Sequence, residues 1–524
     1  MGTKGLRNYV EKHGLVRSSS RGRDGVIKRT NHLLLDMNAI VHYIVPTNVF
    51  TTKSVIEGVV EAVRKLISAF PPSETLVILF DGVAPCAKLQ TQKTRRASYN
   101  KRHSSECTSS LELRYNHDYI GQEISFSREE IIAGSEFLLA CEDAVRCAFG
   151  IGGEFCVPPG EGRNYTIIMS GCAEGGEGEL KVVCVLRTIW LEQRKSQTYT
   201  GDDEIIVVGN DSDLVLVGVA CTPYTKFTIV DPRDYVLTDV GELFKHWGSS
   251  SPGNQIRPDL LPSYRIDFVF LMLLSGGDWF EGIGKVALVF WRRYRELRLH
   301  CGYFKRSLIR GEGFDVDIEF LRAVMAVKDV SSPAKYMSKI KQMTMKESPL
   351  SREAIEEGVE LLKGAVWALR SIVAGQCYDY KFRAHTKKPT AGMLKGASHV
   401  KGLLGKIRPV SESPLPCFSP LEQCIAVLGL RGRFSSPIHM VIKEGSVNQG
   451  EKLTNSFSSE FLLDETRRLM SQVKVDELTA AEQDLLQVRH MRFLESEDGK
   501  ITFMSFHPEK QAVADVRVCD GGVK

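Results

Sequence analysis

Short apolar runs that end in carboxylates are the feature that most constrains this chain. The run EIIVVGND (204–211) has the composition of a strand buried on both faces, and it ends at Asp211, with Asp213 two residues further on. HLLLD ends at Asp36 and ETLVILFD ends at Asp81 in the same way. Segments with helical spacing of apolar residues separate these runs. This alternation predicts an α/β fold with a mainly parallel central sheet flanked by helices.

The remaining segments extend this prediction. We expect a strand over 164–171 and helices over 54–70, 127–150, 179–195 and 351–375. The chain divides into an α/β domain of residues 1–300 and a mostly helical region of residues 301–524. Residues 383–415 carry seven Lys or Arg against one Glu, together with Gly, Pro and Ser, which predicts a long basic loop.

Carboxylates follow five separate apolar segments. They are Asp36, Asp81, Glu177, Glu179, Asp211, Asp213 and Asp278. Because ligands gather at the carboxyl ends of parallel strands, we expect these side chains to converge on one edge of the sheet. Like charges in one cleft require cations, and oxygen ligands without Cys or His select Mg²⁺ or Mn²⁺. Two such ions can cleave a phosphodiester. A single Asp after a strand is more often a turn former or a helix N-cap.

A basic segment follows Asp81 directly. Residues 86–103 contain six Lys or Arg and no acid. If the segment is helical, one face carries Lys88, Gln92, Arg95 and Arg96, which could hold a terminal phosphate. The alternative is a solvated charged helix. His42, six residues after Asp36, either packs in the core or stacks on a base near the cleft.

Composition excludes several other classes of protein. The formal net charge of +4 excludes a global polycation, and the longest central apolar run, FVFLMLLSGG, is too short to span a bilayer. The thirteen Cys are scattered and form no CxxC pair, which argues against a zinc ribbon or a disulfide framework. We therefore expect an intracellular protein, in the nucleus or the cytoplasm, with no membrane association.

Seven motifs together resemble the Xrn family of 5′→3′ exoribonucleases, within the flap endonuclease and PIN-like nuclease superfamily. They are MGTKGLRNYV, LLLDMNAIVH, FDGVAPCAKLQTQKTRRA, AGSEFLL, SGCAEGGEGELK, GNDSDLVLVGVA and DFVFLMLLSGGDW, in the family's order. The resemblance spans about residues 1–290, and a weaker one continues at 366–380 and 418–427. It implies that residues 1–300 are the nuclease domain and that the sheet is a PIN/FEN-like nuclease core.

The resemblance also implies an activity and a set of roles. The activity is metal-dependent 5′→3′ degradation of 5′-monophosphorylated single-stranded RNA to mononucleotides, in RNA decay or processing, with two Mg²⁺ or Mn²⁺ ions. The seven acids match the family's metal-site residues. Lys88, Gln92, Arg95 and Arg96 match its 5′-monophosphate pocket, and His42 matches the residue that stacks on the first base. Trp367 matches an aromatic that completes this pocket, or is a core residue of an amphipathic helix.

The chain also departs from the family's pattern. Ala39 stands where the family favours Gly, Cys86 where it has Arg, Leu180 where it has His, and Gly277 where it has Asn. Two other functions stay open. GGDWFEGIGKVALVF (276–290) resembles the duplex-binding element of flap endonucleases, and a nuclease fold can also serve as an inactive RNA-binding scaffold.

Overall fold

The structure is a computed structural model of the 524-residue chain. It describes residues 3, 5–19, 25–45, 51–89, 91–92, 128–151, 156–160, 163–248, 256–300, 303–311, 313–326, 351–408, 416–449, 459–487, 489–495 and 501–506. Within these ranges, no helix combines the length and the apolarity needed to cross a membrane.

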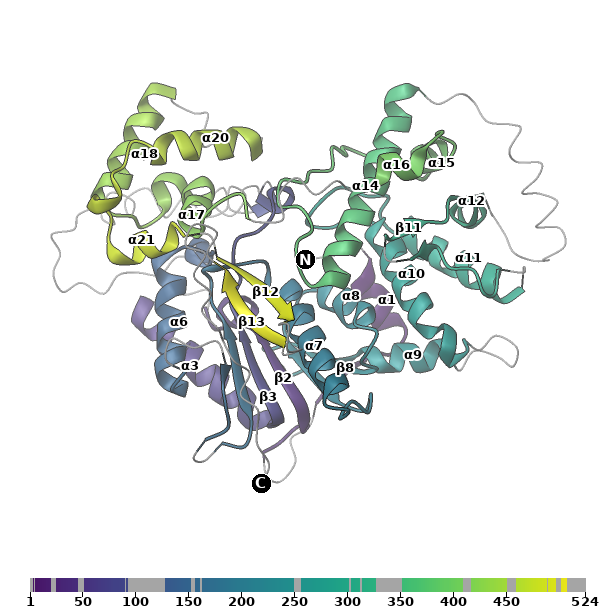
Figure 1. The fold of residues 1–524 in the computed structure, drawn as a ribbon, viewed down its shortest axis with the longest axis horizontal. Helices are drawn as coiled ribbons and strands as arrows, with labels where there is room; N and C mark the ends of the chain where they lie inside the picture. The colour runs from purple at the N-terminus through teal and green to yellow at the C-terminus, as the bar shows by residue number, and fades with distance from the viewer. Residues whose placement is uncertain are drawn as a thin grey trace.

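An eight-stranded sheet forms the centre of the N-terminal region (Figure 1). Its order is β1-β9-β8-β7-β2-β3-β5-β4. The strands are β1 (Val16–Arg17), β2 (Thr30–Asp36), β3 (Pro72–Leu79), β4 (Cys156–Val157), β5 (Thr166–Ser170), β7 (Glu204–Val208), β8 (Lys226–Val230) and β9 (Leu237–Asp239). The five inner strands β8, β7, β2, β3 and β5 are parallel, and the outer ones pair antiparallel. The predicted α/β fold with a mainly parallel sheet is therefore confirmed.

The inner strands are buried on both faces, which explains why their sequences are apolar runs rather than alternating patterns. In β2, Leu33 and Leu35 face one core and Leu34 faces the other. The first core lies against α2 (Met37–Ile44), α3 (Thr52–Ala69) and α6 (Glu136–Phe149). The second lies against α7 (Gly178–Lys195), α8 (Asp213–Ala220) and α10 (Leu261–Leu273). Helices thus cover both faces of the sheet.

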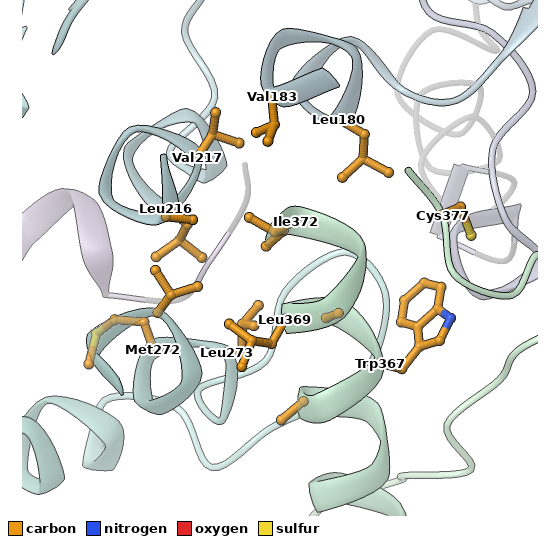
Figure 2. Close-up of a cluster of buried hydrophobic side chains, with 14 of the residues drawn as sticks. Leu180, Val183, Leu216, Val217, Met272, Leu273, Trp367, Leu369, Ile372 and Cys377 are labelled. Atoms are coloured by element: carbon orange, nitrogen blue, oxygen red, sulfur yellow. The ribbon is translucent and has the colours of Figure 1, made fainter. Parts of the chain in front are cut away.

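A long helix joins the C-terminal region to this second core. Figure 2 shows α14 (Arg352–Ala374) packing Leu369 and Ile372 among side chains of α7, α8 and α10. Leu180 and Val183 come from α7, and Met272 and Leu273 from α10. The helix is amphipathic and ends at Gly375, whose φ of 69° is suited to the left-handed C-cap. One continuous hydrophobic cluster therefore runs across residue 300.

The other elements surround this frame. The helices are α1 (Leu6–Lys12), α9 (Val240–Gly248), α11 (Val286–His300), α12 (Ile318–Ala326), α15 (Ala391–Ala397), α16 (Leu403–Ile407), α17 (Pro420–Leu428), α18 (Ser436–Gln449), α20 (Ser459–Met470) and α21 (Ala480–Leu485). Short 3₁₀ turns are η1 (Arg128–Glu130), η2 (Pro258–Leu260), η3 (Gly429–Arg431) and η4 (Val475–Glu477). β10 (Ile309–Arg310) and β11 (Asp315–Val316) form a hairpin.

A second sheet brings the C-terminal segment to the N-terminal domain. β12 (Arg489–Glu495) pairs antiparallel with β13 (Ile501–Phe506) and parallel with β6 (Glu174–Gly175). β6 lies in the motif that carries Glu177 and Glu179. Backbone pairing with a strand more than 300 residues later in the sequence therefore supports an acidic motif of the N-terminal domain.

Two sequence predictions are wrong in detail. Residues 127–150 are not one helix, because α6 begins only after its N-cap Ser135, whose side chain accepts from the Leu138 N–H. Gly134 interrupts the pattern with a φ of 83° and lies against the backbone of Pro420. The helical spacing in the sequence cannot reveal this contact, since the contacting residue lies far away in the chain.

The predicted basic loop is the second correction. Within residues 383–408 the chain forms α15 and α16, which pack on α14. Leu394, Ala397, Leu403 and Ile407 are buried there, and Thr390 caps α15. The backbone N–H groups of Lys387 and Lys388 donate to Glu357 on α14. Tertiary packing of a few apolar residues thus overrides a composition that is typical of a loop.

The contact of Gly134 with Pro420 leads to a stability prediction. A Cβ at Gly134 would lie 2.0 Å from the Pro420 oxygen, and its φ is 83°. Gly134→Ala therefore combines backbone strain with a steric clash, and we expect it to destabilise the fold by about 2–4 kcal/mol. Gly150 has a φ of 62°, but a Cβ at this position would meet no atom within 4 Å. Gly150→Ala should cost only about 1 kcal/mol. Urea unfolding of both variants measures the difference, and equal midpoints would contradict it.

Candidate active site

Three helix N-termini hold carboxylates at the carboxyl edge of the sheet. Asp36 ends β2 and caps α2, accepting from the Ala39 N–H at 3.1 Å. Glu177 is the N-cap residue of α7 and Glu179 lies in its first turn. Asp213 is the first residue of α8. The positive end of each helix dipole favours these negative charges, which partly offsets their mutual repulsion.

The strand register brings these residues to one place. Asp36 pairs with Leu79 of β3, two residues before Asp81, and Leu35 pairs with Val208 of β7, three residues before Asp211. A cleft of about 340 Å³ opens at this edge. Its lining includes five of the seven predicted acids, namely Asp36, Asp81, Glu179, Asp211 and Asp278.

The other two acids lie beside the cleft. Asp213 borders a small adjoining pocket together with Thr3 and Asp278. Glu177 is 3% exposed and forms an ion pair with Lys88, which does line the cleft. The structure therefore places all seven carboxylates in or beside this cleft.

Backbone N–H groups fix the orientation of several carboxylates. The Gly178 N–H donates to Asp81 Oδ1 at 2.6 Å. A Cβ on Gly178 would lie 3.1 Å from that oxygen and 3.5 Å from Asp36 Oδ1, so a larger residue would crowd the space between the two acids. The Asp213 N–H donates to Asp211 Oδ1 at 3.0 Å. These bonds preorganise the oxygen atoms at the strand ends.

Burial and repulsion shift the protonation of the acids. Burial, reinforced by the charge of Asp81, raises the pKa of Asp36 to about 7. Burial and the neighbouring Asp211 raise the pKa of Asp213 to about 7 as well. Burial also raises the pKa of Glu177 and of Glu179, although Lys88 opposes the rise in both. Simultaneous ionisation of all these carboxylates is therefore unfavourable.

Lys88 carries the opposite charge within this cluster. Burial alone would lower its pKa, but Glu177, Glu179, Asp81 and Asp278 around it raise the pKa of Lys88 well above its usual value. One ammonium group cannot neutralise seven carboxylates. The converging carboxylate oxygens suit a hard divalent cation, so the cleft is a candidate metal centre.

The predicted phosphate-binding face is described in part. Lys88 and Gln92 line the cleft, so both lie next to the acids. Arg95 and Arg96 lie outside the described residues. His42, on α2, is exposed and also lines the cleft. The placement of His42 leaves its ring accessible from the cleft.

Trp367 lies away from the cleft lining. It is 1% exposed, stacks on Phe382 at 4.7 Å and donates its indole N–H to the Asp379 carbonyl. Its ring also meets Trp279 edge-on at 5.7 Å. Trp279 in turn donates to Glu177 Oε2 at 3.0 Å. The structure thus places Trp367 in the core, behind the residue that holds Glu177.

Several residues of the site escape prediction from the sequence. The backbone N–H and the hydroxyl of Thr3 both donate to Asp213 Oδ1, at 2.7 and 2.6 Å. Asn38 accepts from the Asp81 N–H, and Arg128 lines the cleft from η1. Asn38 and Thr3 lie inside motifs quoted above, so their place in those motifs could have identified them as residues of the site. The sequence gives no such signal for Arg128, because the segment around it has the pattern of a helix.

A second acidic group lies at the opposite edge of the sheet. His32, Glu74 and Asp203 come close enough together to hold an ion. His32 Nε2 lies 3.3 Å from Asp203 Oδ2, and this hydrogen bond lowers the pKa of Asp203. Gln193 and Asn31 donate to the two carboxylates. Hydrogen bonding within the protein accounts for this group without a cation.

Residues 1–232 match the family described as XRN 5′-3′ exonuclease N-terminus. Over these residues the chain is similar to the Xrn family. The curated relatives include 5′-3′ exoribonuclease 2 of Candida glabrata, 28% identical over 202 residues that make up 36% of this chain and 19% of the relative. The Gallus gallus protein of the same name is 28% identical over 212 residues, covering 38% and 21%. The matches thus span about one fifth of the relatives' length.

Solved structures give a weaker likeness. The T5 D15 protein, co-crystallised with metal ions, aligns over 72% of this chain and 97% of its own. The TM-score is 0.32 and the identity is 9%. These values are too low to carry an inference, so the Xrn assignment rests on the sequence match and the motifs.

The raised pKa of Asp36 leads to a pH-dependent prediction in metal-free protein. Burial and the charge of Asp81 raise the pKa of Asp36 from its ordinary value of 3.8 to about 7 in the folded protein. The folded state therefore binds the proton more tightly, and raising the pH through this window destabilises the fold. Asp36→Asn removes the charge and keeps an N-cap residue. We expect its melting temperature in EDTA to exceed that of the unchanged protein by about 1–4 °C at pH 8, with no gain at pH 4.5.

Asp202→Asn is the matched control for this measurement. Asp202 is exposed and lies just before β7, at the edge of the sheet opposite the cleft. Its substitution should leave the pH dependence of the melting temperature unchanged. A gain for Asp36→Asn that is the same at both pH values would refute the electrostatic explanation.

Proposed function

We propose that the protein is a metal-dependent 5′→3′ exoribonuclease that degrades 5′-monophosphorylated single-stranded RNA to mononucleotides. The observation that carries this proposal is one cleft that combines converging carboxylates with Lys88, Gln92 and His42, in a chain with an Xrn-family N-terminal region. The biological setting that fits is RNA decay or processing in the nucleus or the cytoplasm.

Each part of the cleft would have a distinct task. The seven carboxylates would hold two Mg²⁺ or Mn²⁺ ions, which supply an activated water and stabilise the departing 3′-oxygen of the phosphodiester. The Ala39 and Gly178 N–H groups orient Asp36 and Asp81 for this purpose. The Thr3 hydroxyl and backbone N–H do the same for Asp213. Preorganised oxygen atoms avoid reorganisation cost when the transition state forms.

The substrate end would be recognised by its phosphate and its first base. Lys88 and Gln92, with Arg95 and Arg96 of the same segment, would hold the 5′-monophosphate. His42 would stack on the terminal base. Release of one mononucleotide exposes a new 5′-monophosphate, so the same contacts serve each cycle. The 5′→3′ direction follows from the family rather than from the geometry.

The flap endonuclease alternative receives less support from residues 276–290. Duplex binding by this element would need free backbone N–H groups near Gly282 and Gly284. The N–H of Ile283 donates to the Leu274 carbonyl, and that of Gly284 donates to the Ser275 carbonyl. These donors are therefore used within the turn. The inactive scaffold is also less favoured, because all seven predicted acids are present in the sequence and five of them line the cleft.

One RNA in two forms, with a 5′-monophosphate or a 5′-hydroxyl, tests the proposal. We expect Mg²⁺-dependent loss of the monophosphorylated RNA alone, with mononucleotides as products and no cleavage in EDTA. Asp211→Asn should slow the reaction at least ~10²-fold, the scale of losing one preorganised charged group. Asp202→Asn, at the other end of the same strand, should not slow it.

The matching single-stranded DNA and a DNA flap separate the alternatives. Preferential cleavage of the flap would move the protein to the flap endonucleases. RNA binding without cleavage of any of the four substrates would favour the scaffold.

A further inference from the structure

Lys88 has a position that its expected role does not explain. It is predicted to hold a terminal phosphate, but its ammonium group forms an ion pair with Glu177, one of the predicted metal ligands. The two side chains are only 12% and 3% exposed. The second oxygen of Glu177, Oε2, accepts from the Trp279 indole at 3.0 Å. Lys88 is thus the counterion of Glu177 Oε1, and the Trp279 indole is the hydrogen-bond donor to Oε2.

The buried Glu177 carboxylate needs a positive charge beside it. A buried carboxylate left without its partner keeps its full desolvation cost, so Glu177 requires a cation of some kind. Lys88 provides one and also lies near Glu179, Asp81 and Asp278. A divalent cation among the same oxygens would provide the same charge balance. Two cations at one carboxylate oxygen repel each other, so only one of them can occupy that position at a time.

We propose that Lys88 competes with a divalent cation for Glu177, and that this competition couples cation binding to binding of a 5′-phosphate. The coupling rests on the proposed function, since it takes the cleft to be a site for metal ions and phosphates. A cation at Glu177 releases the ammonium for an anion beside Gln92, and an anion that attracts Lys88 exposes Glu177. Each ligand thereby strengthens the other by the same factor.

Mn²⁺ binding measured by calorimetry, without RNA, tests the competition directly. Lys88→Met removes the competing ammonium, so we expect Mn²⁺ to bind at least about tenfold more tightly. Lys88→Arg keeps the charge and should bind Mn²⁺ close to the unchanged protein. Arg128→Met is the control for general electrostatics. It removes a cation from the same cleft whose guanidinium contacts the Val45 carbonyl. This control should tighten Mn²⁺ binding by less than about threefold.

A second measurement adds uridine 5′-monophosphate as the phosphate probe. In the unchanged protein and in Arg128→Met, the nucleotide should tighten Mn²⁺ binding several-fold. In Lys88→Met this increase should shrink or vanish. Circular dichroism and thermal melting establish that each variant is folded. The competition is refuted if folded Lys88→Met binds Mn²⁺ no more tightly than Arg128→Met, or if the nucleotide effect is unchanged in it.

The outcomes separate this inference from the proposed function. If the protein cleaves 5′-monophosphorylated RNA but Lys88→Met gains no Mn²⁺ affinity, the competition alone is wrong. If Lys88→Met gains Mn²⁺ affinity and no RNA is cleaved, the competition stands and the exoribonuclease proposal fails.

Discussion

Repulsion among buried carboxylates is the constraint on which the site and much of its surroundings depend. Seven acids converge at the carboxyl edge of the sheet, and burial raises the pKa of several of them. The fold tolerates this concentration of charge because helix N-termini, backbone N–H groups and Lys88 each stabilise part of it. None of these contributions is large enough to neutralise the cluster. The concentration of buried negative charge therefore makes the cleft a candidate cation site.

Segments that are distant in the chain meet at this edge. Thr3 reaches Asp213 from the N-terminus, and Trp279 reaches Glu177 from the turn after α10. Trp367 on α14 packs behind Trp279, while β12 pairs with β6 next to the acidic motif. The C-terminal region therefore supports the geometry of acids that the N-terminal region supplies. A second core that is continuous across residue 300 provides the rigid base for this support.

The structure also shows the surroundings of three residues that depart from the family's pattern. Leu180 is buried in the core between α7 and α14, where an apolar side chain fits its surroundings (Figure 2). Cys86 is buried, and its hydrogen bond with Cys417, together with the nearby Arg383, lowers the pKa of its thiol to about 7 although burial opposes the change. Gly277 lines the small pocket beside Asp213. None of the three replaces one of the seven acids.

The sequence by itself determined the α/β fold and the list of acids. Strands buried on both faces must be apolar runs, and parallel strands place their carboxyl ends together, so position in the chain was sufficient to predict convergence. Tertiary structure alone decided what holds the acids in place. Thr3, Trp279 and Arg128 reach the site through contacts between segments far apart in the chain, and the helices within 383–408 form because α14 offers a surface for their few apolar residues. The local spacing of apolar residues in the sequence does not predict such contacts, because their energy comes from partners that only the folded chain brings together.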